Sequence, residues 1–179
     1  MNLQPTLMGE NVLIRPIRAE DWGEMFAVAS DPEVWALHPV RDRYTAPAFR
    51  VFFDGALACG GGLTFVHRAD GKIMGSSRYY NSAPERGEIE IGYTFLGRAY
   101  WGGAYNREIK RLMLAHILPH VETVVFWVGE KNWRSQRAME KIGGVRRDGV
   151  FTRMNGNVES RNVVFEISRR DFSELGATP

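Results

Sequence analysis

A run of small and aromatic residues, Tyr100-Trp101-Gly102-Gly103-Ala104-Tyr105, is the part of the chain best suited to binding an anion. It follows a segment of alternating apolar and polar residues and precedes an amphipathic segment, so it should join a strand to a helix. Small residues at a helix start leave the first backbone N–H groups uncovered, and those groups have no partner within the helix. Because the helix dipole is positive at this end, the run is predicted to hold a diphosphate.

Two carboxylates upstream of this run are suited to proton transfer. Glu88 and Glu90 lie two residues apart on the alternating segment, so a strand would point both side chains to its polar face. A carboxylate held beside a reacting nucleophile can accept its proton as a general base. We expect Glu90 to fill this role, because it is nearer the glycine-rich run. The alternative for either carboxylate is solvent exposure or an ion pair with Arg78 or Arg86.

A third candidate segment begins at Asn132, whose side chain is suited to cap a helix. Ser135 would share the inner face of that helix with Met139 and Ile142, and Gly143-Gly144 would end it. The Ser135 hydroxyl is therefore a candidate to hydrogen-bond a reacting group. A plain N-cap and a small packing residue are the alternative interpretations of Asn132 and Ser135.

The composition is that of an ordinary globular chain. Its 179 residues are 44% hydrophobic and 25% charged, which predicts one domain over residues 1–179 with its own core. The net charge of +2 is too small to argue for nucleic acid binding. Cys59 is the only cysteine, so no intrachain disulfide can form, and no metal site is expected. With no leader and no apolar run of about 18 residues, we expect a cytoplasmic protein without a membrane partner.

The elements that must position these residues follow from hydrophobic periodicity. Strands are predicted over 11–17, 63–67, 73–80, 86–96 and 121–128, with two more in a closing hairpin over 149–167 about Asn155-Gly156. Helices are predicted over 20–30, 33–37, 48–58 and 103–118, with a further helix after Asn132. The order strand, helix, strand from 86 to 128 implies a parallel pair of strands.

These segments in this order resemble the GCN5-related N-acetyltransferase (GNAT) family, most closely its ribosomal-protein N-acetyltransferase-like branch. Four segments in register carry the resemblance, which covers almost the whole chain: Glu90-Ile91-Gly92-Tyr93, the run 100–105 followed by Glu108, residues 132–143, and the hairpin after Gly149. It implies an α/β (α+β) fold, with a mixed, mostly antiparallel sheet of about seven strands, a splayed parallel pair and helices on both faces. It also implies an acyltransferase that moves an acetyl group from acetyl-CoA to a primary amine in a ternary complex.

The resemblance places coenzyme A between the splayed strands, with its diphosphate on the glycine-rich run. The residues that it implies in contact with the cofactor are Tyr93, Thr94, Phe95, Arg98, Gly102, Gly103, Ala104, Tyr105, Asn132, Ser135 and Arg137. The family has Gln or Arg where this chain has Ala99, and Arg98 is one residue away. An isolated glycine in a strand often marks a bulge, so the break in strand pairing is expected near Gly92.

The 3′-phosphate of coenzyme A calls for a cation. The candidates are Arg107, Lys110, Arg111, Arg134 and Arg137, and the alternative for each is a solvated surface charge. The first three are predicted to lie away from the apolar face of the helix over 103–118.

Acetyl transfer needs a neutral amine, a polarised thioester carbonyl and a proton for the leaving thiolate. Holding the reactants together supplies about 7–11 kcal/mol of the barrier, whereas a general base typically adds 10²–10⁴-fold. The resemblance implies that Ser135 lies near the sulfur and that Asn132 positions the pantetheine amide. The expected catalytic residues are therefore Glu90 and Ser135. The helix after Asn132 carries no tyrosine, the acid that other GNAT enzymes use there, which favours Ser135 or water.

The acceptor is the part of the reaction that the sequence determines least. Aromatic residues from the first helices are candidates for its wall, with the core as the alternative: Trp22, Phe26, Trp35, His38, Tyr44, Phe49 and Phe53. The resemblance implies a protein N-terminus or a small-molecule amine as the acceptor, and we expect no direct nucleic acid partner and a monomer or homodimer. A non-catalytic acyl-CoA-binding module is the alternative function. A phosphate-binding protein using Cys59-Gly60-Gly61-Gly62 ranks lower, because no Gly-Lys-Ser/Thr follows.

Overall fold

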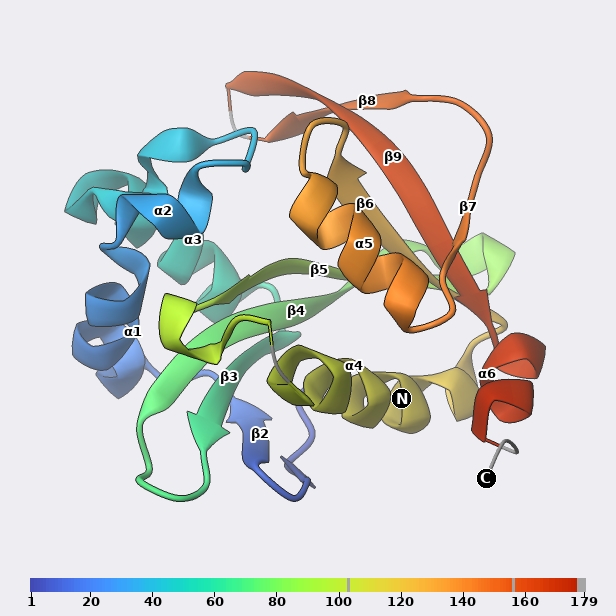
Figure 1. The fold of residues 1–179 in the computed structure, drawn as a ribbon, viewed down its shortest axis with the longest axis horizontal. Coiled ribbons are helices and arrows are strands. Elements are labelled where there is room, and N and C mark those ends of the chain that lie inside the picture. The colour runs from blue at the N-terminus through green and yellow to red at the C-terminus, as the bar shows by residue number, and fades with distance from the viewer. Residues whose placement is uncertain (103, 156, 177–179) are drawn as a thin grey trace.

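The computed structural model describes residues 1–102, 104–155 and 157–176, and Figure 1 shows helices packed around one twisted sheet. The strands are β1 (Leu7–Met8), β2 (Val12–Pro16), β3 (Gly62–His67), β4 (Ile73–Ala83), β5 (Glu88–Leu96), β6 (Thr123–Gly129), β7 (Val145–Arg146), β8 (Phe151–Asn155) and β9 (Val158–Ser168). The helices are α1 (Trp22–Ala29), α2 (Pro32–Trp35), α3 (Ala46–Ala58), α4 (Ala104–Ile117), α5 (Trp133–Lys141) and α6 (Arg169–Gly176).

The sheet confirms the predicted fold class. In the described part of the chain it has nine strands in the order β1-β2-β3-β4-β5-β6-β9-β7, with β8 paired to β9. The β5–β6 pair is parallel, and the other pairs are antiparallel. The sheet exceeds the predicted seven strands by β1 and β7, which have two residues each. Segments this short carry no alternation that a sequence pattern can detect.

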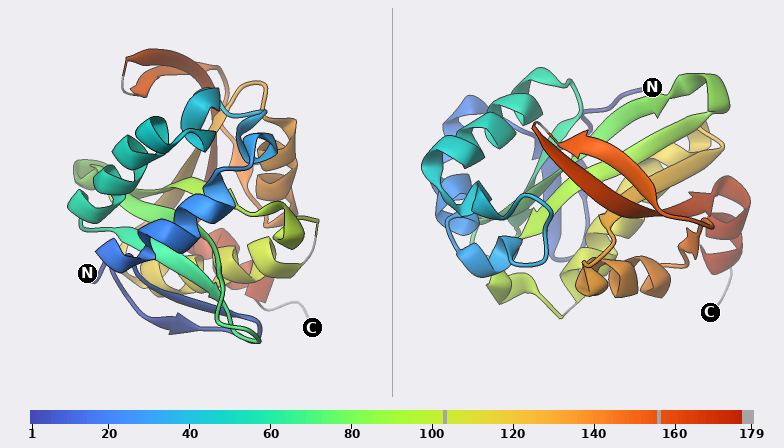
Figure 2. Two further views of the ribbon diagram at one scale, coloured as in Figure 1. Left: turned by 90° about the vertical axis from the view of Figure 1, so that its left-hand side faces the viewer. Right: turned by 90° about the horizontal axis from the view of Figure 1, so that it is seen from above.

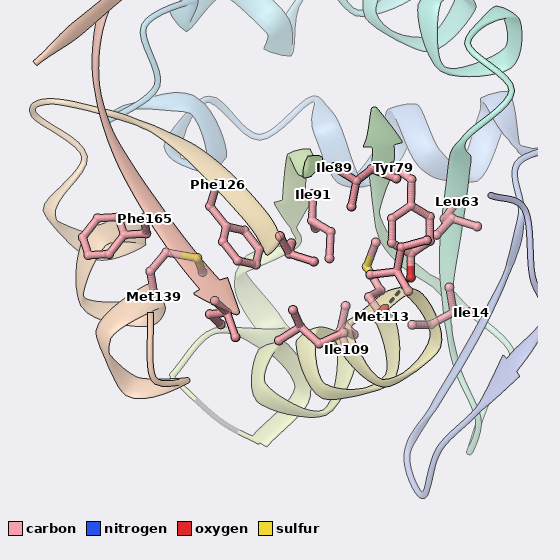
Figure 3. Close-up of a cluster of buried hydrophobic side chains, with 14 of the residues drawn as sticks. Ile14, Leu63, Tyr79, Ile89, Ile91, Ile109, Met113, Phe126, Met139 and Phe165 are labelled. Atoms are coloured by element: carbon pink, nitrogen blue, oxygen red, sulfur yellow. Dashed lines mark hydrogen bonds between the residues drawn. The ribbon is translucent and has the colours of Figure 1, made fainter. Parts of the chain in front are cut away.

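Each face of the sheet carries its own hydrophobic core. On one face, α4 packs Ile109 and Met113 against strand residues such as Leu63 and Ile91, as Figure 3 shows. The opposite face is covered by α1, α2 and α3, whose core includes Phe49. Figure 2 shows the two groups of helices on opposite sides of the strands. The predicted arrangement of helices on both faces is therefore confirmed.

The two parallel strands part soon after they pair. Their register covers only Glu88 with Thr123, Ile89 with Val124 and Glu90 with Val125, although β5 runs on to Leu96 and β6 to Gly129. The predicted splay of this pair is therefore present.

A bulge in β5 turns the strand away. Arg78 of β4 pairs with Gly92 and Ser76 pairs with Phe95, so Ser77 alone faces both Tyr93 and Thr94. A β-bulge is a place where two residues of one strand lie opposite a single residue of its partner, and such a bulge bends the strand that carries the extra residue. Tyr93 has a φ of 54°, which non-glycine residues rarely adopt. The bulge predicted near Gly92 thus falls one residue later, at Tyr93, whereas the pairing of β5 with β6 already ends at Glu90.

The described residues show neither a membrane-spanning helix nor a metal-binding group. No helix among them combines the length and the apolar character needed to cross a bilayer. Nor do they contain a group of three or more His, Cys, Asp or Glu side chains placed to share a metal ion.

Candidate active site

A cleft with about 240 Å³ of space opens where β5 and β6 part. It is bounded by α2 and the segment after it, by β5 and β6, by α4 and the turn before it, by α5 and by the β8–β9 hairpin. Its lining residues are Val34, Trp35, His38, Pro39, Ile91, Gly92, Tyr93, Thr94, Phe95, Leu96, Tyr100, Trp101, Gly102, Asn106, Lys110, Phe126, Trp127, Val128, Gly129, Asn132, Arg134, Ser135, Ala138, Met139, Arg153, Asn155 and Asn162.

The cleft gathers about half of the residues that the sequence assigns to the cofactor. The predicted residues that line it are Tyr93, Thr94, Phe95, Gly102, Asn132 and Ser135. Gly103 lies outside the described residues. The others stand elsewhere: Arg98 pairs with Asp31, Tyr105 bonds His67 Nε2 through its hydroxyl over 3.2 Å, and Arg137 is exposed on α5. Ala104 is exposed at the first position of α4.

The turn before α4 has the predicted strand-to-helix geometry. Gly102 has a φ of +69°, and a Cβ atom added there would meet nothing within 4 Å. Glycine is therefore required by the backbone conformation and not by crowding. The backbone at Gly102 stays open toward the cleft, and α4 begins two residues later.

Lys110 corrects the prediction that placed it away from the buried face of its helix. Its side chain lines the cleft, and only 3% of the residue is exposed. Nζ donates to Thr94 Oγ1 over 2.8 Å and lies 5.4 Å from the Phe126 ring centroid, so it spans the gap between β5 and β6. Burial lowers the pKa of Lys110 to about 7. Leu114, an apolar residue one helical turn after Lys110, lies on the same buried face and was the sequence feature that could have indicated the burial of Lys110.

A short hydrogen-bond chain connects Lys110 to the bulge. The Ser77 hydroxyl donates to the Gly92 carbonyl over 3.0 Å, so in its 2.7 Å contact with Thr94 it must accept. The Thr94 hydroxyl thus donates to Ser77 and accepts from Lys110. The N–H groups of Lys110 that do not contact Thr94 have no partner among the described residues. They are the donors that this side chain can offer to a bound molecule.

Glu90 is fully buried and does not line the cleft. Its two oxygens accept from Arg153 over 2.8–3.1 Å, whereas the sequence suggested Arg78 or Arg86 as partner. That expectation was wrong because Arg153 arrives from β8, which no local pattern brings next to β5. A Cβ atom added at Gly92 would collide with Glu90 Oε1. Since Gly92 lines the cleft, the absence of a side chain there leaves the Glu90 carboxylate next to the cleft wall.

A comparison with family models decides the assignment. Residues 11–145, which make up more than half of the chain, match the acetyltransferase (GNAT) domain. The chain belongs to the GNAT family. It is therefore an N-acetyltransferase, as the resemblance implied. A comparison with curated proteins gives no match.

Solved structures share the fold of this acetyltransferase. A GCN5-related N-acetyltransferase from Brucella melitensis has a TM-score of 0.82 at 21% identity, over 96% of this chain and 82% of that one. A candidate acetyltransferase from T. thermophilus has a TM-score of 0.79 at 27% identity, over 96% and 93%. The ribosomal-protein-S5-alanine acetyltransferase from Vibrio fischeri has a TM-score of 0.70 at 14% identity, over 94% and 98%. The likenesses to the Brucella and Vibrio structures concern the fold alone.

In this acetyltransferase, α5 presents its N-terminal turn to the cleft. The Asn132 Oδ1 atom accepts from the Ser135 N–H over 3.1 Å, so the predicted helix cap is present. The guanidinium of Arg134 lies 3.8 Å from the Trp101 ring centroid, and both side chains line the cleft. Of the five cations suggested for the 3′-phosphate, Lys110 and Arg134 are the two that line the cleft.

The first helices contribute only two of their aromatic candidates to the cleft, Trp35 and His38. The others lie in the aromatic core, against it or in solvent: Trp22, Phe26, Tyr44, Phe49 and Phe53. Burial, followed by the charge of Arg43, lowers the pKa of His38 to about 3, so the ring is neutral at pH 7. The Arg43 guanidinium contacts Nε2 over 3.1 Å, and Nδ1 lies 3.0 Å from the Val40 amide nitrogen and 3.2 Å from the Val40 carbonyl oxygen.

Proposed function

We propose that this GNAT enzyme, acting as one domain over residues 1–179, moves an acetyl group from acetyl-CoA to a primary amine in a ternary complex. The parting of β5 and β6 carries the proposal. Beyond Glu90 the β5 strand has no strand partner on its β6 side among the described residues, and backbone polar groups away from water need hydrogen-bond partners. The two amides of a pantetheine arm supply donors and acceptors of the required kind.

Further features of the cleft support coenzyme A as the ligand. The open backbone at Gly102, next to the start of α4, suits the diphosphate. Arg134, stacked on Trp101 beside that turn, is the cation that we assign to a phosphate. Three or four hydrogen bonds to a charged acceptor, at about 1.5–3 kcal/mol each, suffice for micromolar affinity before ordering costs.

Acetyl-CoA supplies the activated acetyl group and the thiol that leaves. We assign the leaving-group end of the reaction to Lys110 and Ser135, which both line the cleft. Lys110 holds a proton at Nζ in the gap between the strands, and Ser135 offers a hydroxyl from α5. Glu90 stays our candidate for accepting the proton of the amine, through the space that Gly92 leaves beside its carboxylate. Asn132 keeps the assignment to the pantetheine amide, through the Nδ2 group that the helix cap does not use.

Release of free thiol from acetyl-CoA tests the proposal. The purified protein is mixed with acetyl-CoA and a panel of amines: N-terminal peptides, amino acids, polyamines and amine drugs. Thiol release that depends on an amine supports the transferase. Binding of acetyl-CoA in a parallel titration without release from any amine would instead support an acyl-CoA-binding module. Absence of both would overturn the cofactor assignment.

A further inference from the structure

Arginines and aromatic rings alternate across the bulge side of the cleft. We define the arginine row as Arg43, Phe52, Arg78, Tyr93 and Arg153. The Phe52 ring centroid lies 4.8 Å from the guanidinium carbon of Arg43 and 4.7 Å from that of Arg78. The Tyr93 centroid lies 4.4 Å from Arg78 and 5.8 Å from Arg153. Tyr93 and Arg153 line the cleft, so the row ends in its wall.

The row holds more positive than negative charge. Glu90 is the carboxylate buried beside it, and that group is already paired with Arg153. Arg43 and Arg78 are only 8% and 7% exposed, and neither forms an ion pair among the described residues. Asp42, next to Arg43 in sequence, is exposed.

The contacts that Arg43 and Arg78 do make are all neutral. Arg43 contacts His38 Nε2, and Arg78 donates to the Phe52 carbonyl. The Arg78 Nε group is buried and has no hydrogen-bond partner among the described residues. Buried arginines are normally paired with anions, and aromatic faces offset only part of the loss of hydration. Two charges in this row therefore lack the anion that would balance them.

We propose that the acceptor amine carries an anionic group, a carboxylate or a phosphate, which Arg43 binds under the field of the arginine row. The inference rests on the proposed function, because it names the class of acceptor for the same cleft. His38, the partner of Arg43, lines the cleft, so Arg43 lies directly behind that wall. The N–H groups of a guanidinium can donate to two oxygens of either anion at once. The phosphates of coenzyme A do not need this group, since we assign them to Gly102 and Arg134.

Matched acceptors test the charge requirement. The pairs are an amino acid with its amide, and O-phosphoethanolamine with ethanolamine, each assayed with saturating acetyl-CoA. We expect one anionic member to exceed its neutral partner by about tenfold or more in kcat/KM, the effect of one charge-assisted hydrogen bond. The pair that discriminates identifies the source as carboxylate or phosphate. Equal use of both members in each pair, or preference for the neutral members, would overturn the proposal.

Substitution of Arg43 tests the residue. Arg43→Gln should remove most of the preference through a higher acceptor KM, with the KM for acetyl-CoA unchanged, and Arg43→Lys should restore part of it. Arg50→Gln is the matched control, because Arg50 also stacks on an aromatic ring, Trp22, but is exposed and paired with Asp54. A preference that survives in Arg43→Gln would refute the role of Arg43, and so would an equal loss in Arg50→Gln.

A binding measurement separates this inference from the proposed function. The same amine pairs are titrated into the protein with coenzyme A present, so no turnover is needed. Tighter binding of an anionic member, lost in Arg43→Gln, supports the inference even if no amine is acetylated. Equal affinities for both members overturn it even if acetylation occurs.

Discussion

Lys110 Nζ donates to Thr94 Oγ1 over 2.8 Å, at the point where β5 leaves β6. The contact joins α4 to the strand that bulges, and it leaves a buried amine in the floor of the cleft. A lysine in this environment can exchange a proton near neutral pH, because burial lowers its pKa to about 7. The local sequence pattern placed the same residue away from the apolar face of its helix, so its burial in the cleft follows only from the tertiary packing.

Replacing Lys110 with methionine should slow acetyl transfer. Loss of a positioned acid typically lowers the rate by about 10²–10⁴-fold, and we expect a fall in kcat of about 10² with little change in the KM for acetyl-CoA. The wild-type kcat should decline as pH rises through about 7, where Lys110 loses its proton, and the variant should lack that decline. Steady-state kinetics from pH 6 to 9 test this. Lys72→Met, at an exposed lysine, is the control, and an unchanged kcat in Lys110→Met would remove Lys110 from the mechanism.

The same substitution should stabilise the fold, most strongly near neutral pH. The pKa of Lys110 is about 7 in the folded protein and 10.5 when unperturbed, so between these values the unfolded chain binds more protons. The penalty for burying Lys110 is therefore full below pH 7 and disappears as pH rises toward 10.5. Urea unfolding of both proteins at pH 7 and pH 9.5 measures the difference. A gain in unfolding free energy that is no smaller at pH 9.5 would contradict the lowered pKa.

Glu90→Gln should lower kcat by about 10²-fold while leaving acetyl-CoA affinity intact, because a general base contributes a factor of this size. The Arg153 ion pair offers a second explanation for a loss, namely a displaced arginine. Arg153→Gln is therefore measured in parallel. If Glu90 accepts a proton, Glu90→Gln should lower kcat much further than Arg153→Gln does. Equal losses in both variants would reduce Glu90 to a partner that positions Arg153.

Gly102→Val should weaken coenzyme A binding at least tenfold, since a branched side chain would cover the open backbone before α4 and strain its positive φ. Gly71→Val is a closely matched control. Gly71 has a φ of +73°, and a Cβ atom added there also meets nothing within 4 Å, but it does not line the cleft. Calorimetric titration with coenzyme A gives both affinities. Similar losses in both variants would point to general destabilisation and not to a diphosphate site.

Short-range signals predicted most of the elements because their causes are local. Asn132 caps α5 within one turn, and a run of alternating residues forms β5 close to its predicted bounds. The predicted helix 20–30 instead starts as a 3-10 turn over Ala19–Asp21, where the Asp21 carboxylate bonds Arg15 and Thr64. Those partners come from β2 and β3, so only the assembled sheet accounts for them.

The amino-acid sequence alone determined the family, the order of strands and helices, and the glycine-rich turn before α4. These follow from periodicity and from residue types within a few positions of each other, which act before the chain is compact. Tertiary structure decided which charges face the cleft. Arg153 on β8 pairs with Glu90, Lys110 is buried where the two parallel strands part, and Arg98 pairs with Asp31 outside the cleft. Ion pairing and burial depend on neighbours distant in sequence, and no local pattern contains that information.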